Sequence, residues 1–264
     1  MTSQGDRWHV DSRNNRIHST ALVGAEVKMG KDNCVGPFSV VGALGIPVII
    51  GDNNYIGANC VIGSPAESVS EIPGSSLIAL IDKTEPIGAY PQRIGLAIGS
   101  MSVIRDSVTI HAGLENPTQI NDLVYIHSKC HIDHDSVVEV GAVVAPSVAS
   151  GGRVTFGAFS QTGLDSALHQ GTTVGAFSMI GMNSTLKGAT KPFSLYFGSP
   201  SRFRGLNLIR LKRLGLESRA IEEIKELVGQ ESPITDQSRI DSVIRDLVAK
   251  STVEALRIWT GPKK

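Results

Sequence analysis

The sequence predicts a left-handed parallel β-helix built from six-residue repeats, followed by a small α-helical C-terminal domain. Two columns of residues repeat with this period along most of residues 1–200. A large apolar residue recurs at every sixth position, and a mostly small residue follows it four positions later. Neither the 3.6-residue period of a helix nor the simple alternation of a strand keeps both columns in step. The chain is therefore mainly β, with one large and one small inward position in each repeat.

The column of large residues is most regular in the second half of the repeat region. Its members there are Ile126, Ile132, Val138, Val144, Ser150, Phe156, Thr162, Leu168, Val174, Ile180 and Leu186. The small residues that follow are Cys130, Ser136, Ala142, Val148, Val154, Ser160, Ser166, Thr172, Ser178 and Ser184. The same frame occurs earlier, at Ile17, Val23, Met29, Val35, Val41, Ile50, Ile56, Ile62, Ile98, Ile104 and Ile110. A single repeat cannot bury its own apolar residue, so we expect stacked coils to create the core.

Three segments interrupt the repeat, and we expect loops at 42–49, 64–93 and 112–119. The 64–93 segment is rich in Ser, Pro and Gly, and a loop of this length is usually functional or disordered. Residues 1–200 form the predicted β-helix domain, and a helical spacing of apolar residues replaces the repeat within 201–264. Asp236 is a suitable N-cap for the last helix. These helices are expected to cover the open end of the solenoid.

Charge and composition narrow the functional classes. The 25 basic and 25 acidic residues balance, so no overall field favours nucleic acid or a membrane surface. Three cysteines form no disulfide framework. The polar N-terminus lacks the apolar stretch of a secretory signal, and no apolar run approaches the roughly 20 residues of a transmembrane helix. We therefore expect a cytoplasmic protein with no transmembrane segment and no nucleic-acid partner.

The densest polar cluster lies at 125–135. The repeat turns Cys130 inward, which favours a packing role over that of a nucleophile. His131, His134 and Asp135 fall at outward positions. A histidine, whose ordinary pKa is near 6.5, can accept a hydroxyl proton at neutral pH, and an adjacent carboxylate can fix its tautomer. This cluster is therefore a candidate for general-base catalysis.

Other polar groups allow two interpretations each. His169 and Gln170 stand where neighbouring repeats carry small residues, so they are either a variation of a corner or part of a site. His111 is either an ordinary surface residue or part of the same site. The basic residues near the end of the repeats are either a solvated helix start or an anion site; they are Arg202, Arg204, Arg210, Lys212 and Arg213.

Two further functional classes stay open. His127, His131 and His134 are candidate zinc ligands for a hydratase of the γ-carbonic-anhydrase type. Their closeness on one pair of strands argues against this class, because such enzymes gather ligands from more distant coils. The other class is a trimeric scaffold without catalysis.

Four segments together resemble one family, the UDP-N-acetylglucosamine acyltransferases that begin lipid A biosynthesis. They are 104–113, 131–135, 168–170 and 205–215, and the likeness runs from about Ile17 to the C-terminal helices. The resemblance implies a homotrimer with active sites between subunits. It also implies an acyl donor carried on the 4'-phosphopantetheine of acyl carrier protein, a nucleotide-sugar acceptor, and no other cofactor or metal.

The resemblance assigns roles to individual residues. His134 matches the general base, Asp135 its partner, and Gly152 the backbone N–H that donates to the oxyanion. Met182 matches the position that limits acyl length, and a side chain larger than glycine there predicts a chain of about ten carbons rather than about fourteen. The remaining substrate-binding residues that we assign are His111, His131, Arg153, His169, Gln170, Asn207 and Arg213, of which Gln170 and Arg213 lie on the donor side.

The chain departs from the family on the acceptor side. Segment 64–93 replaces the short acidic and amide loop that holds the sugar. Arg153 stands where the family has a histidine, and Ile209 and Leu214 stand where it has an acidic and a basic residue. A related acyltransferase that acts on another acceptor, outside lipid A biosynthesis, is therefore the alternative. Whether oxygen or nitrogen is acylated, and whether carrier protein or coenzyme A brings the chain, also stays open.

Overall fold

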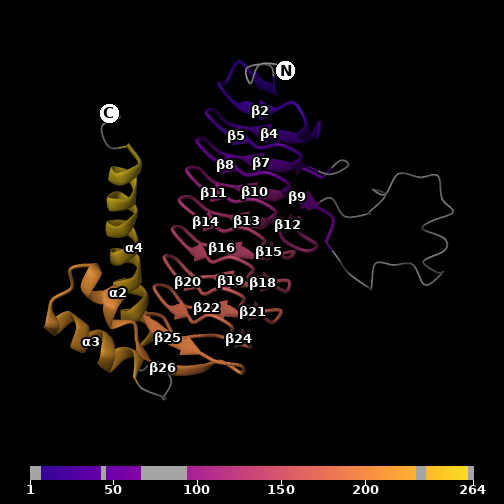
Figure 1. Ribbon diagram of the computed structural model, residues 1–264. Helices are drawn as coiled ribbons and strands as arrows, with labels where there is room; N and C mark the ends of the chain where they lie inside the picture. Colours follow the sequence, from indigo (N-terminus) through magenta and orange to yellow (C-terminus); the bar gives the residue numbers. More distant parts are fainter. Residues whose placement is uncertain (1–6, 43–45, 67–93, 230–235, 261–264) are drawn as a thin grey trace, which may run out of the picture.

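The computed structural model describes residues 7–42, 46–66, 94–229 and 236–260. Short strands stack coil upon coil into a parallel β-helix, and three helices lie beside its C-terminal coils (Figure 1). The predicted fold class is confirmed.

The strands form three sheets, here called sheets I, II and III. Sheet I has 11 strands: β1 (Trp8–Val10), β2 (Arg16–His18), β5 (Cys34–Val35), β8 (Tyr55–Ile56), β11 (Val103–Ile104), β14 (Tyr125–Ile126), β17 (Val143–Val144), β20 (Gln161–Thr162), β23 (Met179–Ile180), β25 (Ser194–Phe197) and β26 (Arg202–Leu206). Sheet II has eight: β3 (Leu22–Val23), β6 (Val40–Val41), β9 (Val61–Ser64), β12 (Thr109–His111), β15 (His131–Ile132), β18 (Ala149–Ser150), β21 (Ala167–Leu168) and β24 (Thr185–Leu186). Sheet III has seven: β4 (Val27–Met29), β7 (Val48–Ile50), β10 (Leu96–Ile98), β13 (Thr118–Ile120), β16 (Val137–Val138), β19 (Thr155–Phe156) and β22 (Thr173–Val174).

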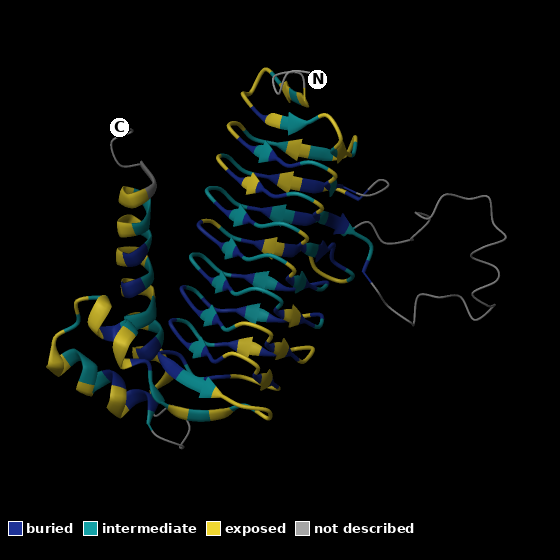
Figure 2. Cartoon of the chain, viewed as in Figure 1, coloured by how far each residue is buried: buried dark blue, intermediate teal, exposed yellow. Residues whose placement is uncertain are grey.

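The strand register places the predicted inward residues above one another. Ile104 pairs with Ile126 in sheet I, and Ile110 with Ile132 in sheet II, and all four are fully buried. Figure 2 shows buried segments, in dark blue, in one coil after another along the stack. The first coil differs, because Val23 keeps 37% of its surface exposed at the end of the stack.

The three interruptions of the repeat leave the solenoid at one corner. They follow β6, β9 and β12, which are consecutive neighbours in sheet II. The chain re-enters sheet III at β7, β10 and β13, so the first and third loops end before Val48 and Thr118, two residues earlier than predicted. Residues 43–45 and 67–93, which belong to the first two predicted loops, lie outside the described part of the chain.

The helices are α2 (Leu208–Arg213), α3 (Ser218–Val228) and α4 (Gln237–Thr260). They begin later than the predicted boundary at 201, because residues 202–206 form β26, which pairs antiparallel with β25 and extends sheet I. Asp236 accepts the Arg239 N–H at 3.0 Å, so the predicted N-cap of α4 is confirmed. Within the described residues, no helix combines the length and apolar character needed to cross a membrane.

A column of three phenylalanines attaches these helices to the solenoid. The rings of Phe159, Phe177 and Phe193 stack at centroid separations of 5.6 and 5.3 Å on the corner between sheets III and I. They join a second apolar core with residues of the helices such as Leu211 and Ile240. The helices therefore pack on the side of the β-helix rather than across its open end.

Candidate active site

The predicted site residues gather at the corner where sheet II turns toward sheet III. His111 ends β12, His134 follows β15, Gly152 follows β18 and Gln170 follows β21. Because these strands are neighbours in sheet II, residues far apart in the sequence form one column on the outside of the coils. Loop 112–119 leaves from the same corner and contacts this column.

His134 and Asp135 form a buried pair. His134 Nδ1 lies 2.8 Å from Asp135 Oδ2, and the two residues are only 7% and 8% exposed. Both side chains thus lie outside the coil, as predicted, but they are shielded from solvent. An ionised carboxylate only accepts, so Nδ1 carries the proton in the neutral ring and Nε2 keeps a lone pair. The pair therefore presents Nε2 as a proton acceptor.

A short stretch of backbone holds Asp135 in place. Its Oδ1 accepts the N–H groups of Leu114, Glu115 and Asn116 at 3.0, 2.9 and 2.7 Å. Burial raises the pKa of the Asp135 carboxyl, but the hydrogen bonds from Asn116, His134 and the neighbouring amides outweigh it. The pKa consequently lies below its ordinary value, and Asp135 stays ionised beside the imidazole.

Asp135→Asn is expected to lower the free energy of unfolding by about 1–3 kcal/mol at pH 7, because three charge-assisted hydrogen bonds lose their charge. A lowered folded-state pKa means that this stabilisation is complete above the ordinary value of 3.8 and is lost as pH falls through the folded value. Chemical denaturation of both proteins from pH 7 to pH 3 measures it. A difference in unfolding free energy that grows on acidification contradicts the assignment.

Gly152 lies directly against the His134 ring. A Cβ built on Gly152 falls 2.4 Å from both Cε1 and Nε2 of His134, which no side chain tolerates. Among the described residues the Gly152 N–H has no acceptor, although its carbonyl accepts the Gly171 N–H at 2.9 Å. A donor without an intramolecular partner, next to Nε2, suits an oxyanion that forms during a reaction.

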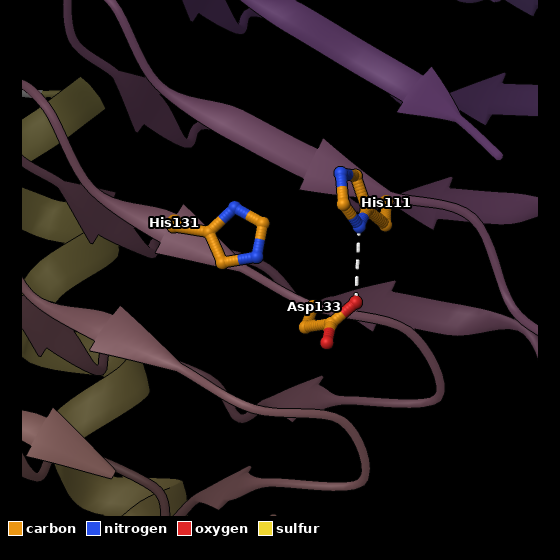
Figure 3. Close-up of side chains that lie close together, drawn as sticks. All are labelled: His111, His131 and Asp133. Atoms are coloured by element: carbon orange, nitrogen blue, oxygen red, sulfur yellow. Dashed lines mark hydrogen bonds and ion pairs between the residues drawn. The ribbon is translucent and has the colours of Figure 1, made fainter. Parts of the chain in front are cut away.

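Figure 3 shows a second acid–imidazole pair, formed by His111 and Asp133. His111 Nδ1 is 3.0 Å from Asp133 Oδ1. The same oxygen accepts the backbone N–H of His134 at 2.7 Å. The His131 ring meets His111 edge to face at 4.7 Å, and its Nδ1 lies 2.6 Å from Thr109 Oγ1. Burial raises the pKa of Asp133, but the hydrogen bonds from His111 and His134 have the larger effect. The pKa of Asp133 therefore lies below its ordinary value.

Arg153 borders the His134–Asp135 pair. Its Nη2 donates to Glu115 Oε1 at 2.9 Å, and its Nε lies 3.9 Å from Asp135 Oδ2. Arg153 thus connects the corner to loop 112–119. At the same corner, His169 and Gln170 are exposed, and His169 Nδ1 lies 3.1 Å from the Gln170 carbonyl.

Three predicted site residues lie elsewhere in the chain. Met182 follows β23 of sheet I and is 64% exposed. Asn207 caps α2, since its side chain accepts the Arg210 N–H and donates to the Phe177 carbonyl, both at 3.2 Å. Arg213 is exposed at the end of α2. A single chain therefore does not bring these residues to His134.

The zinc ligands considered from the sequence are not brought together. His127 follows β14 of sheet I and lies against the Tyr125 ring, whereas His131 and His134 belong to the sheet II corner. Burial raises the pKa of Cys130 to about 11, which supports its packing role. Asp133 and Thr109 are site residues that the sequence analysis did not assign, although the acidic residue between two histidines was a visible signal.

Comparison with known proteins identifies relatives that share most of the chain. A scan of protein-family models finds no match. The acyl-(acyl-carrier-protein)–UDP-N-acetylglucosamine O-acyltransferase of Bartonella henselae is 31% identical over 227 residues, which cover 81% of this chain and 78% of that protein. The protein of the same name from Thermodesulfovibrio yellowstonii is 31% identical over 225 residues, covering 80% and 82%. A match to the Gloeothece citriformis protein of this name spans only 59% of that relative, at 31% identity.

Solved structures support the fold. LpxA from Acinetobacter baumannii superposes with a TM-score of 0.64 at 23% identity, covering 91% of this chain and 93% of that chain. The Arabidopsis UDP-N-acetylglucosamine acyltransferase gives a TM-score of 0.60 at 22% identity, covering 95% and 90%. Together with the sequence identities, these matches show that the chain belongs to the acyl-(acyl-carrier-protein)–UDP-N-acetylglucosamine O-acyltransferase family.

Proposed function

We propose that this protein transfers an acyl group from acyl carrier protein to a hydroxyl or amine of a UDP-N-acetylglucosamine-like acceptor, with His134 as general base. The observation that carries the proposal is the buried His134–Asp135 pair, whose Nε2 lies beside Gly152. The names of the relatives supply the donor and acceptor classes.

The proposed reaction needs no covalent enzyme intermediate. His134 Nε2 takes the proton of the acceptor group as that group attacks the thioester carbonyl. The Gly152 N–H donates to the oxyanion, and the imidazolium is stabilised by ionised Asp135. Collapse breaks the carbon–sulfur bond, and the proton held by His134 passes to the departing phosphopantetheine thiolate. Holding both substrates at one corner supplies the entropic advantage.

We also propose that the active enzyme is a homotrimer with sites between subunits. Met182 and Arg213 lie on faces of the chain away from the His134 corner, so a pocket that uses all of them requires a neighbouring copy. The donor-side role of Gln170, the substrate-binding roles of Asn207 and Arg213, and the cytoplasmic location stay predictions.

The acceptor side supports one alternative, the same chemistry on a different acceptor. Arg153 pairs with Glu115 where the family has a histidine, and Ile209 is 66% exposed where the family has an acidic residue. Segment 67–93, which replaces the sugar-holding loop, lies outside the described residues.

A donor-by-acceptor screen read by mass spectrometry tests the proposal. Acyl carrier protein and coenzyme A thioesters are each offered with UDP-N-acetylglucosamine, with its 3-amino analogue and with amino sugars that carry no nucleotide. An acylated nucleotide sugar supports the proposal, and its fragmentation distinguishes ester from amide. Acylation of only a sugar that carries no nucleotide supports the alternative, and the absence of transfer to any acceptor contradicts both.

Met182→Gly is expected to shift donor preference toward longer acyl chains. Each added methylene that a pocket accepts is worth about 1–3 kcal/mol, so the ratio of kcat/KM for a longer against a shorter donor should rise about tenfold or more. Met182→Leu, which conserves volume, is the matched control and should keep the original ratio. An unchanged preference in Met182→Gly shows that Met182 does not limit chain length.

A further inference from the structure

His111, His131 and Asp133 form a cluster that takes no part in the proton transfers of the proposed reaction. One ligand-type atom from each lies within 4.8 Å of those from the other two. His111 is buried, and the other two side chains are partly buried, at the edge of the His134 corner (Figure 3). We propose that this cluster is a binding site for a transition-metal ion with the preferences of Zn²⁺.

The donor set selects the class of ion. Two imidazoles and one carboxylate suit Zn²⁺ and its first-row neighbours, whereas Ca²⁺ and Mg²⁺ require mostly oxygen. Zinc ligands at about 2.0–2.1 Å from the ion stand roughly 3.3 Å apart in a tetrahedron. The 3.0 Å between His111 Nδ1 and Asp133 Oδ1 is already close to that separation. Zinc therefore takes the place of the hydrogen between these two atoms, and neutral His111 carries its ring proton on Nε2 instead.

The fold orients the third ligand. Thr109 and His131 are paired neighbours on β12 and β15, and His131 Nδ1 bonds to Thr109 Oγ1 at 2.6 Å. That bond leaves Nε2 as the ligand atom of His131, in the way that a partner on one ring nitrogen fixes metal-binding histidines. The pairing of β12 with β15 holds the backbones of the ligand residues in place. Rotation of the three side chains is therefore enough to bring their ligand atoms, now within 4.8 Å of one another, around an ion.

The site is separate from the catalytic pair. The ligand atoms that lie within 4.8 Å of one another belong to His111, His131 and Asp133, and His134 instead bonds to Asp135 through Nδ1 at 2.8 Å. Asp133 connects the two groups, because it accepts the backbone N–H of His134 at 2.7 Å. Metal binding therefore does not depend on the proposed transferase activity, and the two can fail independently.

Titration of the chelator-treated full chain with Zn²⁺, and with Co²⁺ for its absorption spectrum, tests the site. One ion per chain is expected to bind, with a visible Co²⁺ band typical of tetrahedral coordination. Asp133→Asn and His111→Ala should each weaken binding at least tenfold, and Thr109→Val should weaken it about 10- to 100-fold by freeing the His131 ring. His134→Ala and His127→Ala are matched histidine controls and should bind the ion as the unchanged protein does.

Two outcomes overturn the proposal. One is the absence of saturable Zn²⁺ and Co²⁺ binding, and the other is undiminished affinity in Asp133→Asn and His111→Ala. Circular dichroism checks that each variant is folded. If His111→Ala does not fold, Asp133→Asn and Thr109→Val decide the result, because both keep the shape of the original side chain. If the unchanged protein binds the metal but transfers no acyl group, the metal site is supported and only the proposed function is contradicted.

Discussion

Replacing His134 by alanine is expected to lower kcat/KM for acyl transfer by about 100- to 10,000-fold, the usual contribution of a positioned general base. Because Nδ1 of His134 bonds to Asp135, Nε2 is the ring nitrogen that keeps a lone pair for the acceptor proton. The change removes this proton acceptor but keeps the backbone N–H of residue 134, which donates to Asp133. Steady-state kinetics with the donor and acceptor identified in the screen measures the effect.

His127→Ala is the matched control, because His127 is an imidazole of the same β-helix on a different sheet. It should retain the original rate. The thermal unfolding of both variants shows whether a loss of activity results from a loss of stability. Full activity in His134→Ala shows that His134 is not the base and favours the interpretation of the chain as a non-catalytic scaffold.

Gly152→Ala is expected to reduce kcat/KM by about 100-fold, because displacing a catalytic group by an ångström typically costs that much. The new Cβ falls 2.4 Å from His134 Cε1 and Nε2, so the ring must move from its position. The loss should appear mainly in kcat, since both the base and the oxyanion donor act in the transition state. The NMR signals of the His134 ring should shift in the same variant.

Gly151→Ala provides the comparison for this effect. The three atoms nearest to its Cβ all belong to Gln170, the first being the amide nitrogen at 3.0 Å. A smaller loss is therefore expected, with the His134 signals unchanged. Equal activity of Gly152→Ala and the unchanged protein would refute the close packing of Gly152 on the base.

Offsets between neighbouring coils explain why part of the site was predictable and part was not. His134 and Gly152 lie one regular 18-residue coil apart, as do Ser136 and Val154, which hydrogen-bond across the same step. The pair His111 and Asp133 and the pair Thr109 and His131 are instead 22 residues apart. Loop 112–119 creates this larger offset, and its length does not reveal which strands will meet.

The sequence by itself determined the β-helix, because each repeat must turn its apolar residue inward and can bury it only against the next coil. It also determined that His131, His134 and Asp135 face outward together. Only the tertiary structure decided that three backbone N–H groups of loop 112–119 converge on Asp135 and that Asp133 joins two histidines. Backbone amides carry no signal in the sequence, and contacts across an insertion depend on how the chain returns. The fold thus follows from a local period, whereas the site follows from the stacking of coils.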